Sequence, residues 1–238
     1  MRVLALDTTT RAGSVALVVD DRVIDQRAGD ASRTHGERLP AELAALGAAW
    51  PTIDVFAVAA GPGSFTGLRI GIATMQGLAL VNGRRLVGVS ALEALAHLAS
   101  EGAAPGALIA SWIDAQRGEV FSALYEVGDA PVFTPERLRE LEPPAVATPD
   151  ATRSSWARYR LTSAVFSGDG AARYLPGAGS PPLLAGAIGR MAAVSASRGL
   201  TVSPAAIHPL YVRRPDAELA RAASAGAASH AHVDPVDR

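Results

Sequence analysis

The sequence predicts an α/β protein with two related lobes, each a mixed sheet flanked by helices. Three strand-like segments at the start are followed by alternating helical and strand-like segments, a pattern typical of a mixed sheet covered by helices. An apolar strand that ends in aspartate occurs at residues 4–7 and again at 111–114. In both places a polar turn and a returning apolar strand follow, which indicates an internal duplication.

Length and charge limit the possible functions. The chain has 238 residues, of which 49% are hydrophobic, so it can bury one large core or the cores of two lobes. Its formal net charge is -1, so no global field attracts it to nucleic acid or to an anionic membrane, and any RNA contact must be local. The N-terminal segment lacks the apolar length of a secretory signal, so we expect a cytoplasmic protein that does not bind membranes.

Two residue types are absent, and each absence excludes a group of enzymes. The chain has no cysteine, which excludes disulfides, thiolate nucleophiles and cysteine-based metal sites. It also has no lysine, so the Walker lysine, the Schiff-base lysine and the kinase strand lysine are unavailable.

The first lobe is predicted to consist of a three-stranded antiparallel meander followed by alternating helices and strands. Leu39, Leu43 and Leu46 recur at the spacing of one helical face, which predicts the first helix. The third helix begins at Ser90, with Glu93 three residues later for a capping box. The other predicted segments are strands at 3–6, 14–19, 22–27, 55–60 and 85–89 and a second helix at 66–81.

The second predicted helix, residues 66–81, is apolar on nearly all sides. Its only strongly polar side chains are Arg69 and Gln76, and it is too short and too polar to span a bilayer. A helix that is apolar all round must be covered on more than one side. We therefore expect another protein chain to supply the second cover.

The second lobe is less regular, because proline pairs interrupt it. We expect a strand at 164–167 and a helix at 183–196. The Gly-Ala-Ala-Pro-Gly stretch at 102–106 is the expected boundary. The predicted division is therefore an N-terminal lobe at 1–103, a C-terminal lobe at 104–212, a segment at about 213–226 that returns to the first lobe, and a flexible tail at 227–238.

A glycine-rich turn, GPGSFTG at residues 61–67, precedes the second helix. Its G-x-G-x-x-x-G spacing is one residue longer than the dinucleotide fingerprint, and the sheet is entered as a meander, so a Rossmann site is not predicted. Two interpretations are open: an anion cradle at a helix N-terminus, or a structural turn. Gly67 and Gly71 lie one helical turn apart, which permits close approach of a neighbouring backbone.

Two strand-end aspartates are candidate nucleotide ligands. Asp7 is followed by Thr8 and Thr9, and Asp114 ends the corresponding strand of the second lobe. Carboxylates at such positions can hold magnesium while hydroxyl-rich turns bind phosphate. The alternative is that each carboxylate accepts hydrogen bonds from its own turn. The stretch after Asp114 lacks the glycine and threonine of a working phosphate loop, so any cofactor site here is predicted to be vestigial.

Neither a metal site nor a strong RNA site is evident. His35 would need a second ligand four residues later on the same helical face, and that position is Leu39, so no metal is predicted. Residues 153–160 interleave three arginines with two aromatic residues, which is typical of RNA contact or of a solvated face. No catalytic residue can be assigned from the sequence.

With these residues in view, the chain resembles the TsaB (YeaZ) family over nearly its whole length. Departures are small: Gly36 stands where a serine is common, and the tail after Glu218 has no clear counterpart. The resemblance rests on residues 61–71, Leu6-Asp7-Thr8-Thr9, Arg33, His35, Glu37, Leu39-Pro40, residues 114–120, Gly168-Asp169-Gly170 and Pro209-Leu210-Tyr211-Val212-Arg213.

The resemblance implies an actin-like, Hsp70-like ATPase fold of the ribonuclease H type that has lost its active site. The catalytic paralogue of the family, TsaD, has a metal-binding H-x-E-G-H helix, whereas this chain has His35 but Leu39 in place of the second histidine. Family members pair through the first two helices of the N-terminal lobe, with the paralogue or with themselves. No cofactor of its own is implied, although the assembled complex could bind ATP or ADP.

The function implied is that of a non-catalytic dimerization subunit in tRNA threonylcarbamoyladenosine biosynthesis. It would bind and activate TsaD, together with the ATPase subunit TsaE, during threonylcarbamoyl transfer to the adenosine beside the anticodon of ANN-decoding tRNAs. It would form a homodimer when alone and meet tRNA through the complex. The expected partner contacts are His35, Leu39, Leu43, Leu46, Leu68, Ile72, Met75 and Ala79.

A rival hypothesis is a small-molecule phosphotransferase or ATPase on the same fold, which would use Asp7 and Asp114 with magnesium.

Overall fold

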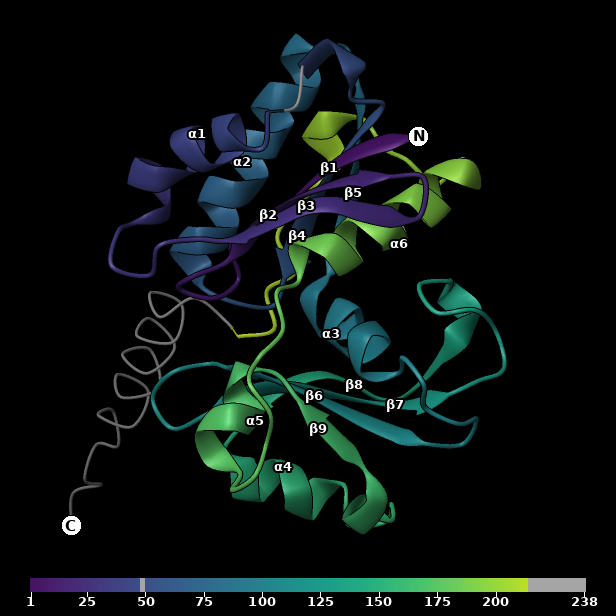
Figure 1. The fold of residues 1–238 in the computed structure, drawn as a ribbon. Coiled ribbons are helices and arrows are strands. Elements are labelled where there is room, and N and C mark those ends of the chain that lie inside the picture. The colour runs from purple at the N-terminus through teal and green to yellow at the C-terminus, as the bar shows by residue number, and fades with distance from the viewer. Residues whose placement is uncertain (48–49, 214–238) are drawn as a thin grey trace, which may run out of the picture.

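Two β-sheets, each flanked by helices, form the body of the protein (Figure 1). The computed structural model describes residues 1–47 and 50–213. Of the predicted divisions, the returning segment beyond Arg213 and the tail at 227–238 lie outside the described residues.

The first sheet has the strand order β3-β2-β1-β4-β5. Strand β1 pairs antiparallel with β2 and parallel with β4, so the sheet is mixed, as predicted. The middle strands are buried on both faces, which agrees with their nearly continuous apolar sequences. The strands are β1 (Arg2–Asp7), β2 (Ser14–Val19), β3 (Arg22–Ala28), β4 (Val55–Gly61) and β5 (Arg85–Ser90).

The second sheet repeats the arrangement of the first, which confirms the predicted duplication. Its order is β8-β7-β6-β9, and β6 pairs antiparallel with β7 and parallel with β9, as β1 does with β2 and β4. Asp7 and Asp114 therefore end equivalent strands. The strands are β6 (Leu108–Asp114), β7 (Val120–Val127), β8 (Leu138–Ala147) and β9 (Val165–Ser167).

Strand β8 is absent from the sequence prediction, because Pro143 and Pro144 lie inside it. Proline cannot donate a ladder hydrogen bond, so it argues against a central strand. In the structure β8 is an edge strand, and its pairing with β7 shifts register between Ser122 and Tyr125. The proline pair is tolerated there because, among the described residues, one side of the strand has no neighbouring strand.

The helices cover the outer faces of the sheets and fill the space between them (Figure 1). Helices α1 and α2 pack on one face of the first sheet, α6 covers the other face, and α3 lies between the two sheets. Helices α4 and α5 pack on the face of the second sheet that points away from α3 (Figure 1). The bounds are α1 (His35–Ala45), α2 (Phe65–Val81), α3 (Ala91–Ala99), α4 (Pro149–Ser155), α5 (Asp169–Tyr174) and α6 (Ala185–Ser197), with short 3-10 turns at η1 (Trp50–Thr52), η2 (Pro135–Arg137), η3 (Leu161–Ser163) and η4 (Pro204–Ala206).

Helix α6 corrects one sequence expectation. The sequence predicts that residues 183–196 form a helix of the second lobe, but α6 packs against β1, β2 and β4 of the first sheet. Gly189 permits this contact, since a Cβ at that position would lie 2.5 Å from Val18 and 3.3 Å from Ala5. The boundary near residue 103 stays a prediction.

A row of glycines joins helix α2 to the loop that follows β1. A Cβ at Gly63 would lie 2.7 Å from the main-chain oxygen of Thr9, and one at Gly67 would lie 2.2 Å from that of Thr8. One at Gly71 would lie 2.1 Å from the hydroxyl of Thr8. These glycines are four residues apart and form one stripe, so the predicted close backbone approach is confirmed. We call this contact the glycine seam.

The glycine seam gives a stability prediction with a control on the same helix. Gly67→Ala should destabilise the protein by about 1–3 kcal/mol, because the added Cβ overlaps the Thr8 carbonyl. Gly77→Ala should instead stabilise it by up to about 1 kcal/mol, because a Cβ there meets nothing within 4 Å and alanine favours helix. Urea unfolding of the two variants measures both effects, and equal midpoints would contradict this account of the seam.

Candidate functional site

A cleft of about 1010 Å³ lies where the two halves of the molecule meet. Its walls come from the loop after β1, the start of α1, the start of α2, the β6–β7 turn and the C-terminal segment. Two of the four predicted cofactor residues, Thr9 and Asp114, line the cleft. Asp7 and Thr8 lie beneath the surface, with exposed fractions of 3% and 0%.

Asp7 is occupied by its own turn. Its carboxylate accepts hydrogen bonds from the Thr9 main-chain N–H at 2.8 Å and from the Thr9 hydroxyl at 2.6 Å. Burial raises the pKa of the Asp7 carboxyl, while the Thr9 hydrogen bonds act in the opposite direction. Of the two interpretations considered for this residue, the geometry favours a carboxylate that stabilises its turn.

Asp114 is occupied in a similar way. Its carboxylate accepts from the Gln116 main-chain N–H at 3.0 Å and from the Gln116 side chain at 2.9 Å. It also forms an ion pair with Arg173 at 2.9 Å. Asp169 lies beside it, accepting a hydrogen bond from the Asp114 N–H, and burial raises the pKa of the Asp169 carboxyl.

These contacts bear on whether a magnesium nucleotide fits the cleft. A hard cation needs several free oxygen ligands. Both carboxylate oxygens of Asp114 are engaged by donors of the chain itself, and Oδ1 of Asp7 accepts both Thr9 hydrogen bonds. Within residues 1–47 and 50–213 no group of three potential metal ligands comes together. This arrangement does not favour the magnesium-dependent rival hypothesis.

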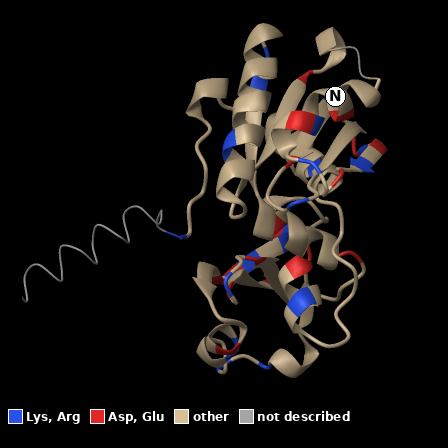
Figure 2. Ribbon diagram, turned by 90° about the vertical axis from the view of Figure 1, so that its left-hand side faces the viewer, with Lys and Arg blue, Asp and Glu red and all other residues tan. Residues whose placement is uncertain are grey.

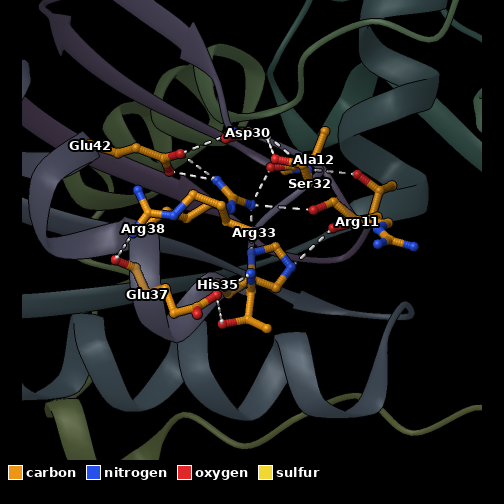
Figure 3. Close-up of polar contacts among 12 residues, drawn as sticks. Arg11, Ala12, Asp30, Ser32, Arg33, His35, Glu37, Arg38 and Glu42 are labelled. Carbon is orange, nitrogen blue, oxygen red and sulfur yellow. Dashed lines mark hydrogen bonds and ion pairs between the residues drawn. The ribbon is translucent and has the colours of Figure 1, made fainter.

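Arg38 connects helix α1 to the rim of the cleft (Figure 3). Only 2% of this side chain is exposed, and it forms an ion pair with Glu42 one turn later at 2.5 Å. Its guanidinium also donates to the main-chain oxygens of Ala12 and Arg11. The loop after β1 is therefore fastened to α1 by a buried charge, a role that the sequence analysis misses. The sequence signal for this role is an arginine directly before Leu39, the first residue of the predicted apolar row.

His35 occupies the junction between Arg38 and the cleft (Figure 3). Its Nδ1 lies 2.6 Å from an Arg38 nitrogen and its Nε2 lies 3.1 Å from the Thr10 main-chain oxygen. Because arginine can only donate and a carbonyl can only accept, Nδ1 must be the acceptor and Nε2 must bear the proton. Burial, with a smaller effect of the Arg38 charge, lowers the pKa of His35, so the neutral ring is favoured.

The comparisons with known proteins decide the family. A family model described as "TsaD: tRNA N6-adenosine threonylcarbamoyltransferase" matches residues 27–169. YeaZ from Pseudomonas aeruginosa superposes with a TM-score of 0.70 at 29% identity, over 88% of this chain and 99% of that one. The TsaB protein of Escherichia coli K12 is 37% identical over 150 residues, 61% of this chain and 64% of that protein. The chain belongs to the TsaB (YeaZ) family.

A mycobacterial relative matches this chain over nearly its whole length, whereas the curated TsaB relatives match over only part of theirs. The uncharacterized protein Rv3421c of Mycobacterium tuberculosis H37Rv is 33% identical over 227 residues, 91% of this chain and 93% of that protein. The chain spans only 52–64% of the length of three curated TsaB relatives. The two mixed sheets and the YeaZ likeness identify the fold as the actin-like, ribonuclease H-like ATPase fold, as predicted.

The TsaB-family partner contacts expected from the sequence are mostly core residues, which is a correction. The apolar members of that set are between 0% and 6% exposed and pack against the first sheet or the glycine seam. They are therefore unavailable to a partner in this conformation. His35 is likewise 9% exposed and bound within its own chain. The corrected residues are His35, Leu39, Leu43, Leu46, Leu68, Ile72, Met75 and Ala79.

The opposite faces of the same two helices are exposed. On α2, Ala73, Gly77 and Leu80 follow one another at helical spacing and face solvent, with Leu80 73% exposed. On α1, Ala41 and Ala44 are exposed. We call these residues the α1–α2 face. The sequence prediction assigns the larger side chains to the partner, whereas the first sheet of the same chain buries them.

The sequence-predicted RNA patch at 153–160 is only partly available. Trp156 is 3% exposed and packs 6.4 Å from Trp112, so it belongs to the core of the second sheet. Arg158 is paired with Glu142 and lies 5.0 Å from the Tyr159 ring. The stacking surface expected from two aromatics is therefore reduced to one partly exposed tyrosine.

No face of the described chain is dominated by charge of one sign. Arginine and acidic positions intermingle over both halves of the described chain (Figure 2), in agreement with the net charge of -1. In the part of the chain that the structure describes, no helix has the length and hydropathy needed to cross a bilayer.

The state of His35 leads to a pH prediction. Its pKa is lowered in the folded protein, so below about pH 6.5 the unfolded chain binds more protons and the free energy of unfolding falls as pH falls. His35→Gln can donate to Thr10 and accept from Arg38 without titrating. Urea unfolding between pH 7.5 and 5.5 should show the variant gaining stability relative to the wild type as pH falls. The exposed His208→Gln serves as control, and a pH-independent difference for His35→Gln would contradict the assignment.

Proposed function

We propose that this TsaB-family chain is a non-catalytic subunit for tRNA threonylcarbamoyladenosine biosynthesis, which binds and activates the catalytic paralogue TsaD. Its relatives in Escherichia coli and Bacillus subtilis are named as proteins of that biosynthesis. In the described residues the strand-end carboxylates serve the chain's own turns, which supports a role without chemistry of its own.

The solvent exposure of the α1–α2 face is the observation that best supports a pairing role. It exposes small residues, which let a neighbouring helix approach closely, next to the large apolar side chains of Leu80 and Val81 at 73% and 85% exposure. Apolar surface of this kind gains about 25 cal/mol for each Å² removed from water. In this proposal the same face contacts TsaD in the complex and a second copy when the chain is alone.

Other members of the proposed assembly follow from the same hypothesis. TsaE would join the complex as the ATPase subunit, and tRNA would be met through the complex in the cytoplasm. ATP or ADP would be bound by the assembled complex, with no cofactor required by this chain. One solved neighbour from Pseudomonas aeruginosa is described as similar to peptidase YeaZ, but the present proposal gives this chain no peptidase activity.

Pairing can be tested on exposed positions that leave the core intact. Ala73→Glu and Leu80→Glu should each weaken binding to TsaD of the same organism at least tenfold, because a charge must be desolvated in the contact. Light scattering and calorimetry measure the binding, and circular dichroism checks the fold. Ile24→Glu on β3, 59% exposed, is the matched control. Met75→Glu should instead unfold the chain, since that residue is 0% exposed. Full pairing by both α2 variants would overturn the assignment of this face.

The pathway itself is tested in the native cell. Depletion of the chain should remove threonylcarbamoyladenosine from ANN-decoding tRNAs, as measured by nucleoside mass spectrometry, and the wild-type gene should restore it. Asp7→Ala tests the rival hypothesis in the purified chain: micromolar ATP binding that this change abolishes would favour an ATPase.

A further inference from the structure

An exposed aromatic cluster stands at the rim of the cleft. Phe65, the first residue of α2, and Tyr211, from the C-terminal segment, are each 42% exposed, and both line the cleft. Their rings stack with centroids 5.2 Å apart. Arg69, one turn along α2, lies 3.9 Å from the Phe65 centroid and donates through Nε to the Tyr211 hydroxyl at 2.9 Å. We call these three residues the rim cluster.

The rim cluster is held in place by the fold beneath it. The N–H of Leu210 donates to the Ala60 main-chain oxygen at 2.7 Å, which fixes the C-terminal segment beside β4. Gln76 donates to the main-chain oxygens of Pro204 and Ile207, which fixes the same segment against α2. Hydrogen bonds thus hold the segment that carries Tyr211 against β4 and α2, while Phe65 and Tyr211 each stay 42% exposed.

The arginines around the rim keep their charge available. Arg11 and Arg33 are exposed and line the same cleft. Arg11 donates to the Ala31 main-chain oxygen and Arg33 to that of Glu37, and within residues 1–47 and 50–213 neither they nor Arg69 form an ion pair. Among the described residues two carboxylates line the cleft: Asp114 is paired with Arg173, and Asp169 accepts a hydrogen bond from the Asp114 N–H.

We propose that the rim cluster, with Arg11 and Arg33, binds single-stranded RNA. One unstacked base would lie against the exposed aromatic surface, and the neighbouring phosphates would meet the arginines. Single strands are bound by aromatic side chains on which bases stack together with cations that follow the phosphates. Here the cations are a local group, since the net charge of the chain is -1. The inference rests on the proposed role in tRNA modification for its choice of RNA, and it assigns the contact to this subunit.

The rim is a better RNA surface than the patch at 153–160. There, the indole of Trp156 is enclosed and Arg158 is paired with Glu142. At the rim both aromatic residues are 42% exposed, and among the residues that the structure describes its three arginines form no ion pair, although Asp30 and Glu37 lie near Arg33. A free mononucleotide has the same base and phosphate groups, so the test must separate it from RNA.

The binding test uses the full chain, alone and in complex with TsaD. A fluorescein-labelled anticodon stem-loop of an ANN-decoding tRNA is titrated and followed by anisotropy. Phe65→Leu, which keeps apolar volume but removes the ring, should weaken RNA binding about tenfold. Arg11→Ala with Arg33→Ala should reduce the slope of log affinity against log salt by about 1.4, or about 0.7 for each phosphate that an arginine no longer neutralises. Tyr159→Leu on the second lobe is the matched control and should change neither quantity.

Cross-linking locates the contact independently of stability. Ultraviolet cross-linking of the same RNA, read by mass spectrometry, should place the adduct on the peptide that contains Phe65 or the one that contains Tyr211. An adduct only elsewhere, or Phe65→Leu binding RNA as the wild type does, would overturn the inference. Displacement of the RNA by micromolar AMP or ATP would also overturn it and assign the rim to free nucleotide.

TsaD pairing is measured on the same variants. Intact pairing with unchanged RNA affinity in Phe65→Leu would refute the RNA contact and leave the proposed function standing. Failure of the wild-type chain to pair would refute the proposed function directly.

Discussion

Gly63, Gly67 and Gly71 bring helix α2 against the loop that follows β1, closer than any side chain would permit. The main-chain oxygens of Thr8 and Thr9 lie where a Cβ would otherwise be, and the Ser64 N–H donates to the Thr9 oxygen at 2.8 Å. A contact between two backbones has little freedom to shift. It therefore fixes the depth of α2 on the sheet and, with it, one wall of the cleft.

The depth of α2 on the sheet decides which face of the helix is buried and which is exposed. The helix sinks far enough for Ile72, Met75 and Ala79 to join the core formed with β1 and β4. The other side, formed by Ala73, Gly77 and Leu80, is left in solvent although it has no charged residue. An apolar helix that its own chain leaves partly in solvent is the physical basis for the proposed pairing with TsaD.

The equivalent loops after β1 and β6 are each held by hydrogen bonds within the chain itself. Asp7 and Asp114 end equivalent strands, and each carboxylate accepts hydrogen bonds from the turn that follows it. In the second loop Arg173 adds an ion pair to Asp114. The strand order is retained in both halves, while Oδ1 of Asp7 and both carboxylate oxygens of Asp114 are engaged by nearby donors. The fold and the chemistry of its cleft are thus separable properties.

Most of the helices and strands, the duplication and the close approach at Gly67 and Gly71 are predictable from the amino-acid sequence, because local periodicity and the absence of a side chain depend only on neighbouring residues. The buried side of α2 is not predictable in this way, since an apolar pattern all round contains no preferred direction. Tertiary packing also places Trp156 in the core and returns α6 to the first sheet. The rim cluster joins Phe65 to Tyr211 across 146 positions of chain, and only the packing of the C-terminal segment on α2 brings these two rings together.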